Sequence, residues 1–289
     1  MLPTNLQLWR WFAAILIMDE LGHKRERLKA EMGLGSHPVA IAGCDLRSSH
    51  FWLGVEHGYG DDCPPMNFLR KKFAGSPDYA RVAPFVIFVV LTSLQGKFGE
   101  DSRYWLYLLK TLVGAWLIWE MRPFVTEMRW NISWEAVVVG VAIFAVWVGL
   151  DGLYPRLSEL DPAGWNPNKQ FGQGSALAWL YMVVRIGGSS IVVPPLEEAF
   201  YRSYVYRVLV KTDFRAMPLN QFHWLSFVVT SSVFGLMHPD RWVGGILCGL
   251  AFQWLVIRKN RLGDAMTAHA ITNCLLGLWV IWKGAWTFW

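Results

Sequence analysis

The sequence predicts an all-α, polytopic integral membrane protein with seven to eight transmembrane helices. Three observations lead to this prediction: the composition, the length of the apolar runs and the absence of alternation within them. Of the 289 residues, 54% are hydrophobic and 17% are charged, whereas a soluble domain has about 45–50% apolar and about 25% charged residues. The excess of apolar residues argues against a soluble enzyme, and the many aromatic residues argue against a disordered chain.

From Arg81 onward, apolar runs alternate with short polar breaks. The runs are Val82–Leu94, Tyr104–Trp119, Trp134–Tyr154, Ser175–Val193, Leu196–Val210, Phe222–Met237, Trp242–Ile257 and Ala265–Trp282. Several approach the ~20 residues that a helix needs to cross ~30 Å of hydrocarbon. Because the runs are continuous, they exclude a transmembrane β-barrel and leave helices. The distribution of Lys and Arg between the breaks favours seven crossings, whereas the positions of the polar motifs described below favour eight.

Polarity divides the chain into three predicted parts. Residues 1–78 hold nine basic and nine acidic residues and form a polar N-terminal segment that is non-native or poorly ordered; the whole formal charge of +5 therefore belongs to the rest. Residues 79–174 are predicted to be the N-terminal transmembrane helices, and residues 175–289 a transmembrane core that carries the polar motifs described below. Met66 precedes a basic stretch and the first long apolar run, so we predict that the natural chain starts there and that residues 1–65 are not native. The positive charge fits anionic lipid headgroups, and the apolar bulk favours a membrane over nucleic acid as partner.

The stretch Pro194-Pro195-Leu196-Glu197-Glu198-Ala199-Phe200-Tyr201-Arg202 stands out, because acidic residues are scarce in the apolar runs. Two adjacent prolines predict a break in which one helix ends and another begins. Glu197 and Glu198 then fall in a first turn, where the helix dipole stabilises carboxylates. Glu198 and Arg202 are four residues apart and can pair, which leaves Glu197 free to point elsewhere. The simpler alternative is a helix cap at the membrane interface.

Two histidines lie in equally apolar surroundings. His238 follows Phe234 by four residues, and Asn273 follows His269 by four. Either histidine alone would more often make an interhelical hydrogen bond. Together with Glu197, these side chains are the parts of a water-activating hydrolase, namely a base, a polarising group and oxyanion donors; they could equally hold Zn²⁺.

A further polar residue, Arg185, lies inside the run Ser175–Val193. It is either a buried partner of one of the acids or a side chain that snorkels to the membrane surface. Cys248 and Cys274 also lie in apolar runs, where cysteine usually serves packing and not catalysis.

The pattern Glu197-Glu198-x-x-x-Arg202, Phe234-x-x-x-His238 and His269-x-x-x-Asn273 resembles the three motifs of the CPBP family. This family comprises type II CAAX prenyl endopeptidases and bacterial Abi-type, bacteriocin-processing homologues, and the resemblance covers residues 175–283. The closing stretch, from Gly263 to Trp289, is similar to CAAX prenyl protease-related proteins associated with exosortase sorting systems.

The resemblance implies an intramembrane endopeptidase that hydrolyses a peptide bond in a membrane-anchored or lipidated protein or peptide. Glu197 would activate water with assistance from His238, and His269 and Asn273 would stabilise the oxyanion. Three residues would support the site: Glu198, Arg202 and Phe234. No cofactor is certain: the family is catalogued as metallopeptidases, but a metal-free glutamate mechanism is also argued for it. Zinc, if present, would be held by Glu197, His238 and His269.

The resemblance further implies a multi-pass protein of a bacterial inner membrane. Its partners would be membrane lipids, the peptide substrate and a sorting-system (exosortase) protein. Two other functions are open: a catalytically inactive immunity or scaffold protein of a sorting system, and a proton-coupled carrier that uses the same glutamate and histidines. Intact motifs argue against the first, and the absence of an inverted repeat argues against the second.

Overall fold

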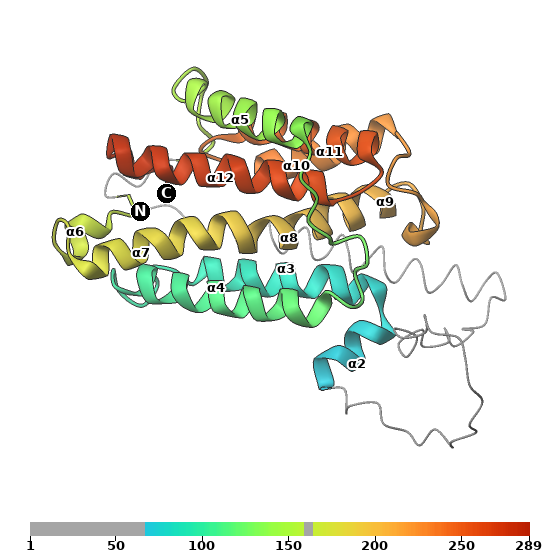
Figure 1. The fold of residues 1–289 in the computed structure, drawn as a ribbon, viewed down its shortest axis with the longest axis horizontal. Coiled ribbons are helices and arrows are strands. Elements are labelled where there is room, and N and C mark those ends of the chain that lie inside the picture. The colour runs from blue at the N-terminus through green and yellow to red at the C-terminus, as the bar shows by residue number, and fades with distance from the viewer. Residues whose placement is uncertain (1–66, 159–163) are drawn as a thin grey trace, which may run out of the picture. The chain divides into compact units, whose positions relative to one another are not determined.

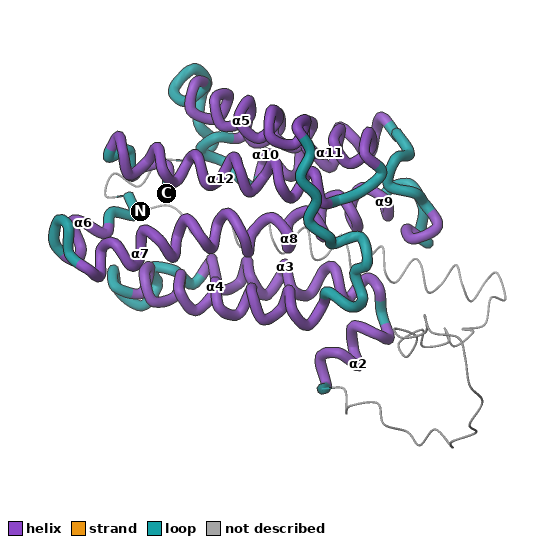
Figure 2. Tube along the Cα trace, viewed as in Figure 1, coloured by secondary structure: helices purple, strands orange, loops and turns teal. Residues whose placement is uncertain are grey.

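The structure is a computed structural model that describes residues 67–158 and 164–289. Within these ranges all regular structure is helical and no strand occurs, so the predicted all-α class is confirmed (Figure 2). The predictions about residues 1–65 and about a start at Met66 lie outside the described residues. The helices are α2 Phe68–Gly75, α3 Pro77–Ser93, α4 Ser102–Met121, α5 Trp134–Gly149, α6 Pro167–Phe171, α7 Ala176–Gly187, α8 Val193–Glu198, α9 Tyr206–Val208, α10 Trp224–Leu236, α11 Trp242–Lys259 and α12 Gly263–Lys283.

Residues 75–289 form one compact unit. In it, α3 and α4 pack together on one side of the long central stretch from α7 to α9 (Figure 1). Helix α12 lies against the other side of that stretch, antiparallel to it. Helices α5 and α11 pack on α12, and α10 packs on α11 and on the last part of the central stretch. The central stretch and α12 are therefore neighbours, and they carry most of the motif residues.

Serine residues cap the N-termini of three of these helices. Ser76, Ser133 and Ser175 have extended backbones, and each side-chain oxygen accepts a hydrogen bond from the backbone N–H three residues later. Such a cap satisfies a donor that the first turn of a helix leaves unpaired. The polar breaks between the apolar runs therefore fix where α3, α5 and α7 start.

The predicted break at Pro194-Pro195 is wrong. Residues Ala176–Val208 form one continuous helix of 33 residues, so the two runs that the sequence separates at this point are a single element. Wide π-helical turns lie on either side of the prolines, at Gly188–Val192 and Ala199–Val205. In the first of them, the N–H of Val193 reaches back five residues to the carbonyl of Gly188. We infer that this shift in the bonding pattern lets the helix accommodate two residues that lack an N–H and would otherwise interrupt it.

Two helices in the described part are long and apolar enough to cross a membrane by length and composition: Ala176–Val208 and Gly263–Lys283. Trp134–Gly149 and Trp224–Leu236 are apolar but shorter. The outer faces of these helices carry exposed apolar side chains, such as Trp134, Val183 and Trp282, which would be costly in water and suit lipid contact. The number of crossings, seven or eight, stays a prediction.

Candidate active site

Glu198 is the centre of a buried polar cluster. Its Oε1 accepts a hydrogen bond from Nδ1 of His269 at 2.9 Å, and its Oε2 lies 3.2 Å from Nε of Arg202. The side chains of Glu198 and Arg202 are completely buried. Arg202 follows Glu198 by four residues on the same helix, whereas His269 comes from α12. The carboxylate thus joins the two helices that carry the first and the third motif.

Glu197 faces the other nitrogen of the same imidazole. Its Oε2 lies 3.9 Å from Nε2 of His269, and this oxygen is buried without a hydrogen-bond partner in the part of the chain that the structure describes. The distance is too long for a hydrogen bond, so both atoms are available to a water molecule or a substrate atom. Since an ionised carboxylate only accepts, Nδ1 of His269 carries the hydrogen donated to Glu198.

The ring of Phe234 packs against several members of the site. Its centre lies 4.7 Å from Cζ of Arg202, 5.1 Å from the ring of His238 and 6.2 Å from the ring of His269. His238 follows the end of α10, and its Nδ1 bonds the backbone carbonyl of Phe234 at 3.0 Å. That nitrogen must donate to the carbonyl, which leaves Nε2 of a neutral ring as an acceptor.

Asn273 lies one turn after His269 on α12. Its Nδ2 donates a hydrogen bond to the carbonyl of Ser189 at 2.8 Å, in the π-helical turn before the prolines. The bond ties α12 to the central helix on the other side of the glutamates. It uses one of the two amide hydrogens, so the second amide hydrogen is available for another acceptor.

The structure therefore brings the predicted site residues together to different degrees. Close polar contacts join Glu197, Glu198, Arg202 and His269. Among the described residues, the contacts of His238 with this group run through the ring of Phe234, and the hydrogen bond of Asn273 goes to Ser189.

The three residues predicted to hold zinc do not form a ligand set. Within residues 67–158 and 164–289, no group of three or more His, Cys, Asp and Glu side chains is placed to hold a metal ion. No contact between His238 and either glutamate occurs in these ranges, so His238 does not join Glu197 and His269 as a third ligand. The arrangement does not fit zinc, and the steps proposed below use the side chains alone.

Two aromatic residues flank the histidines, and no sequence motif singles them out. Trp147 of α5 lies edge-on to His238, with ring centres 5.4 Å apart, and Phe252 of α11 lies 5.2 Å from His269. In the sequence, both are ordinary members of apolar runs. Only the tertiary packing of α5 and α11 against α10 and α12 reveals them.

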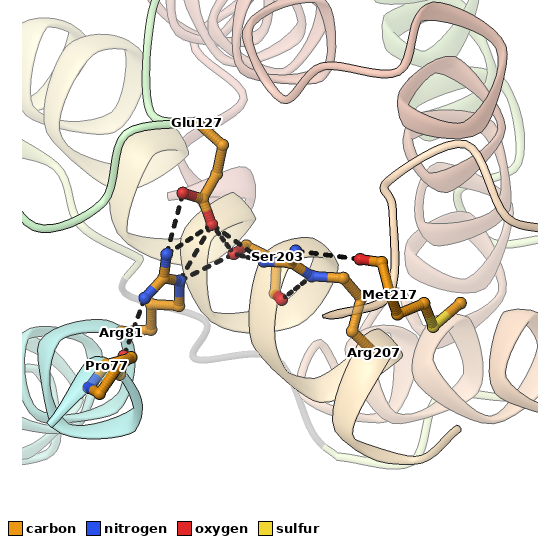
Figure 3. A network of polar contacts seen from close by, with 6 residues as sticks. All are labelled: Pro77, Arg81, Glu127, Ser203, Arg207 and Met217. Atoms are coloured by element: carbon orange, nitrogen blue, oxygen red, sulfur yellow. Dashed lines mark hydrogen bonds and ion pairs between the residues drawn. The ribbon is translucent and has the colours of Figure 1, made fainter. Parts of the chain in front are cut away.

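A second polar cluster holds the far end of the central helix (Figure 3). Arg81 of α3 donates to both oxygens of Glu127, at 2.7 and 2.9 Å, and to Oγ of Ser203 at 2.9 Å. Arg207 donates to Oε1 of Glu127 at 2.9 Å and to Oγ of Ser203 at 2.7 Å. Glu127 lies in the segment between α4 and α5. One carboxylate therefore fastens this segment, α3 and the helix that carries Glu197 to one another.

Arg81 and Ser203 determine the charge state of Glu127. Burial alone raises the pKa of this carboxyl, but the positive charge of Arg81 and the hydrogen bond from Ser203 lower it, and the net pKa lies below its ordinary value of 4.5. Glu127 is therefore ionised at neutral pH and balances one of the two guanidinium charges.

Comparison with known proteins supports the motif assignment. Residues 178–275 match the model of a family described as type II CAAX prenyl endopeptidase Rce1-like. The comparisons with curated proteins and with solved structures found no match. The matched region is about a third of the chain and includes every motif residue from Glu197 to Asn273. The resemblance to the CPBP family is thus confirmed over residues 178–275, which match the Rce1-like type II CAAX prenyl endopeptidases.

Proposed function

We propose that the protein is an intramembrane endopeptidase in which glutamate and histidine side chains activate water. One observation carries the proposal: Glu197 and His269 present Oε2 and Nε2 to each other at 3.9 Å, while Glu198 fixes the other face of the imidazole. A carboxylate and an imidazole that are both within reach of one small molecule can move a proton at a reacting centre. The match to a family of endopeptidases over the same residues supports this chemistry.

In the proposed reaction, a water molecule bound to Oε2 of Glu197 gives its proton to that oxygen and attacks the carbonyl carbon of the peptide bond. Nε2 of His238, left as an acceptor by the bond from Nδ1 to the Phe234 carbonyl, would orient this water. Glu197 then passes the proton to the leaving nitrogen, so that the carboxylate is regenerated and both products leave neutral at the cleaved bond.

Negative charge on the carbonyl oxygen of the intermediate needs hydrogen-bond donors. The second amide hydrogen of Asn273 is one candidate, since the first is held by Ser189. His269 is the other, and it can donate from Nε2 only when the ring carries both protons, because Nδ1–H already donates to Glu198. Glu198 and Arg202 would then position His269 without touching the substrate.

The substrate class that fits this site is a membrane-anchored or lipidated peptide. Glu197 lies in the long apolar helix Ala176–Val208, and α12 is the second helix long enough to cross a bilayer, so a peptide reaches the carboxylates from within or beside the lipid. We place the protein as a multi-pass protein in a bacterial inner membrane. Association with an exosortase sorting system stays a prediction.

The test compares purified wild-type protein with Glu197→Gln and His238→Ala in detergent. The probes are an S-farnesylated peptide that ends in Cys-aliphatic-aliphatic-Met and an acyl-anchored peptide without the prenyl group, with products identified by mass spectrometry. We expect at least a 10³-fold loss of cleavage for Glu197→Gln, since the base is removed, and a smaller loss for His238→Ala. Glu135→Gln is the matched control, because Glu135 pairs with Lys259 outside the cluster.

Equal cleavage by wild type and Glu197→Gln would overturn the proposal and favour an inactive scaffold. A chelator is expected to leave wild-type cleavage unchanged. Loss of cleavage with chelator, followed by recovery on addition of zinc, would show that a metal takes part and that the ligand set differs from the one predicted.

A further inference from the structure

Gln253 of α11 is a buried amide whose polar atoms have no partner. The residue is completely buried, and neither its Oε1 nor its Nε2 makes a hydrogen bond with any residue that the structure describes. Taking an amide out of water without a compensating hydrogen bond is costly. Because nearly all buried polar groups in folded proteins are hydrogen-bonded, this amide needs an explanation.

The guanidinium of Arg202 carries further unpartnered atoms. Its Nε lies 3.2 Å from Oε2 of Glu198, and its side chain is completely buried. Its Nη1 and Nη2 are buried and make no hydrogen bond within residues 67–158 and 164–289. The ring of Phe234 covers the guanidinium at 4.7 Å. A guanidinium has five N–H donors, so most of those in Arg202 are left for an acceptor other than Glu198.

Thr230 of α10 faces the same part of the central helix. Ser226, Thr230 and Phe234 are spaced by four residues and therefore share one face of α10. The hydroxyl of Ser226 donates to the backbone carbonyl of Tyr206, and the ring of Phe234 packs on Arg202. Thr230 lies between these two contacts. It is completely buried, and its hydroxyl has no partner in the part of the chain that the structure describes.

The close packing of α11 on α10 brings Gln253 to this level. A Cβ at Gly249 would lie 2.8 Å from Cα of Ser231, and Gln253 follows Gly249 by four residues on the same face of α11. A long side chain in a helix leans back toward the N-terminus of the helix, here toward Gly249. Ser231 is itself completely buried, and its hydroxyl is unpartnered among the described residues. The amide of Gln253 is therefore directed to the turn of α10 that holds Thr230 and Ser231.

These side chains combine donors with acceptors. The guanidinium only donates, the two hydroxyls donate and accept, and the amide of Gln253 has two N–H groups and one carbonyl oxygen. Water also donates and accepts, and an internal water molecule makes about three hydrogen bonds to buried polar groups. An anion fits this mixed set less well, because it would face the carbonyl oxygen of Gln253.

The charge of Arg202 also favours a neutral ligand, since Glu198 already balances it. Arg185, on the same helix, is placed differently. Its guanidinium lies over the rings of Trp165 and Tyr107, at 4.8 and 4.9 Å, and forms no ion pair with a described residue, so the prediction that it pairs with one of the acids is wrong. Arg202 needs acceptors for its N–H groups and not a second negative charge.

We propose that the amide of Gln253, the two hydroxyls of α10 and the guanidinium of Arg202 bind internal water. Gln253 is then a positioning residue of the site. It acts through this water on Arg202, and Arg202 holds Glu198, whose Oε1 fixes the imidazole of His269 at 2.9 Å. The effect of Gln253 on catalysis rests on the proposed function, whereas the binding of water does not.

The first test detects the water directly. A short X-ray pulse converts bound water into hydroxyl radicals, which oxidise the side chains beside it, and mass spectrometry locates the oxidised residues. We expect Phe234 to be oxidised in the wild type although it is 2% exposed. In the double variant Gln253→Met/Thr230→Val, oxidation of Phe234 should fall at least about fivefold. Water at Glu197 is present in both proteins, so the difference between them reports this site. Phe85, also 2% exposed, should stay protected in both.

The second test measures cleavage of the S-farnesylated peptide in detergent. Gln253→Met keeps the length of the side chain without its hydrogen-bonding atoms, so we expect kcat to fall about tenfold with little change in KM. Gln253→Asn keeps the amide, which a further water molecule can connect to the site, and should retain most of kcat. Thr111→Val is the matched control, because the hydroxyl of Thr111 bonds the carbonyl of Tyr107 on its own helix. Its kcat should equal that of the wild type.

The outcomes separate this inference from the proposed function, because the labelling of Phe234 does not depend on cleavage. Protection of Phe234 in the wild type, or equal oxidation in the wild type and the double variant, would overturn the water site. Equal losses of kcat in Gln253→Met and Gln253→Asn would assign Gln253 to packing and overturn its positioning role. Chloride that raises the unfolding temperature of the wild type but not of Gln253→Met would also overturn the proposal, in favour of an anion site.

Discussion

Glu198 and His269 are 71 residues apart in the sequence and form a buried hydrogen bond of 2.9 Å. The bond joins the central helix to α12 and determines which nitrogen of the imidazole carries its hydrogen. Because Nδ1 is held in this way, Nε2 is directed toward Glu197. The second glutamate of the motif therefore sets the orientation and the tautomer of the histidine that faces the first.

Replacing Glu198 by glutamine should impair both stability and catalysis. The change leaves the buried guanidinium of Arg202 without a counterion, and removing one partner of a buried pair costs about 3–5 kcal/mol. It also removes the anionic acceptor of Nδ1–H, so we expect cleavage to fall at least 100-fold. Thermal unfolding and peptide cleavage in the same detergent would check both effects. An unchanged melting temperature would contradict the role given to this pair.

Trp147 should act as a positioning residue for His238. Its ring packs edge-on against the imidazole from α5, outside the region that matches the family. Trp147→Leu should lower kcat about tenfold with little change in KM. The substrate is still bound, but the imidazole of His238 loses the aromatic ring that packs against it and holds its orientation. Trp147→Phe, which keeps an aromatic edge, should recover most of kcat. Equal losses for both variants would mean that Trp147 serves packing alone.

The sequence predicts the members of the site better than their contacts. The pairing of Glu198 with Arg202 follows from a spacing of four residues, and the structure contains it. The bond from His269 to Glu198 cannot be read from spacing, since it depends on how α12 packs on the central helix. Trp147 is missed for the same reason, because its contact with His238 arises from packing between distant segments.

The Pro194-Pro195 stretch shows where a local rule fails. Two prolines usually end a helix, because they lack the backbone N–H that donates to the carbonyl four residues earlier in an α-helix. Here the chain forms a helix with π-helical turns before and after them, and the element continues for 33 residues. The continuous helix also explains how the first and third motifs meet. The helix runs antiparallel to α12. Glu197 in its second half therefore lies beside His269 near the start of α12, with Oε2 and Nε2 3.9 Å apart.

Glycines where α10 crosses α11 should not tolerate a side chain. A Cβ at Gly249 would lie 2.8 Å from Cα of Ser231, and backbone cannot move away as a flexible side chain can. We expect Gly249→Ala to cost about 1–3 kcal/mol in unfolding free energy, as overpacking does. Gly187→Ala is the control, because nothing lies within 4 Å of its Cβ position and alanine favours a helix by about 0.5–1 kcal/mol. If both variants unfolded at the same temperature, the close approach of the two helices would be wrong.

The cluster around Glu127 should make the stability of the protein sensitive to acid. Its pKa in the folded state is below the ordinary value of 4.5, so its contribution is fully present above about pH 4.5 and is lost as the pH falls through the folded-state pKa. Protonation leaves Arg81 and Arg207 without their shared acceptor. In Glu127→Gln this loss is already complete, so the variant should be less stable than the wild type at pH 7 by about 2–3 kcal/mol. Its melting temperature should also depend less on pH. Melting curves recorded from about pH 3 to about pH 7 would check this, and two parallel profiles would exclude Glu127 as the group that titrates.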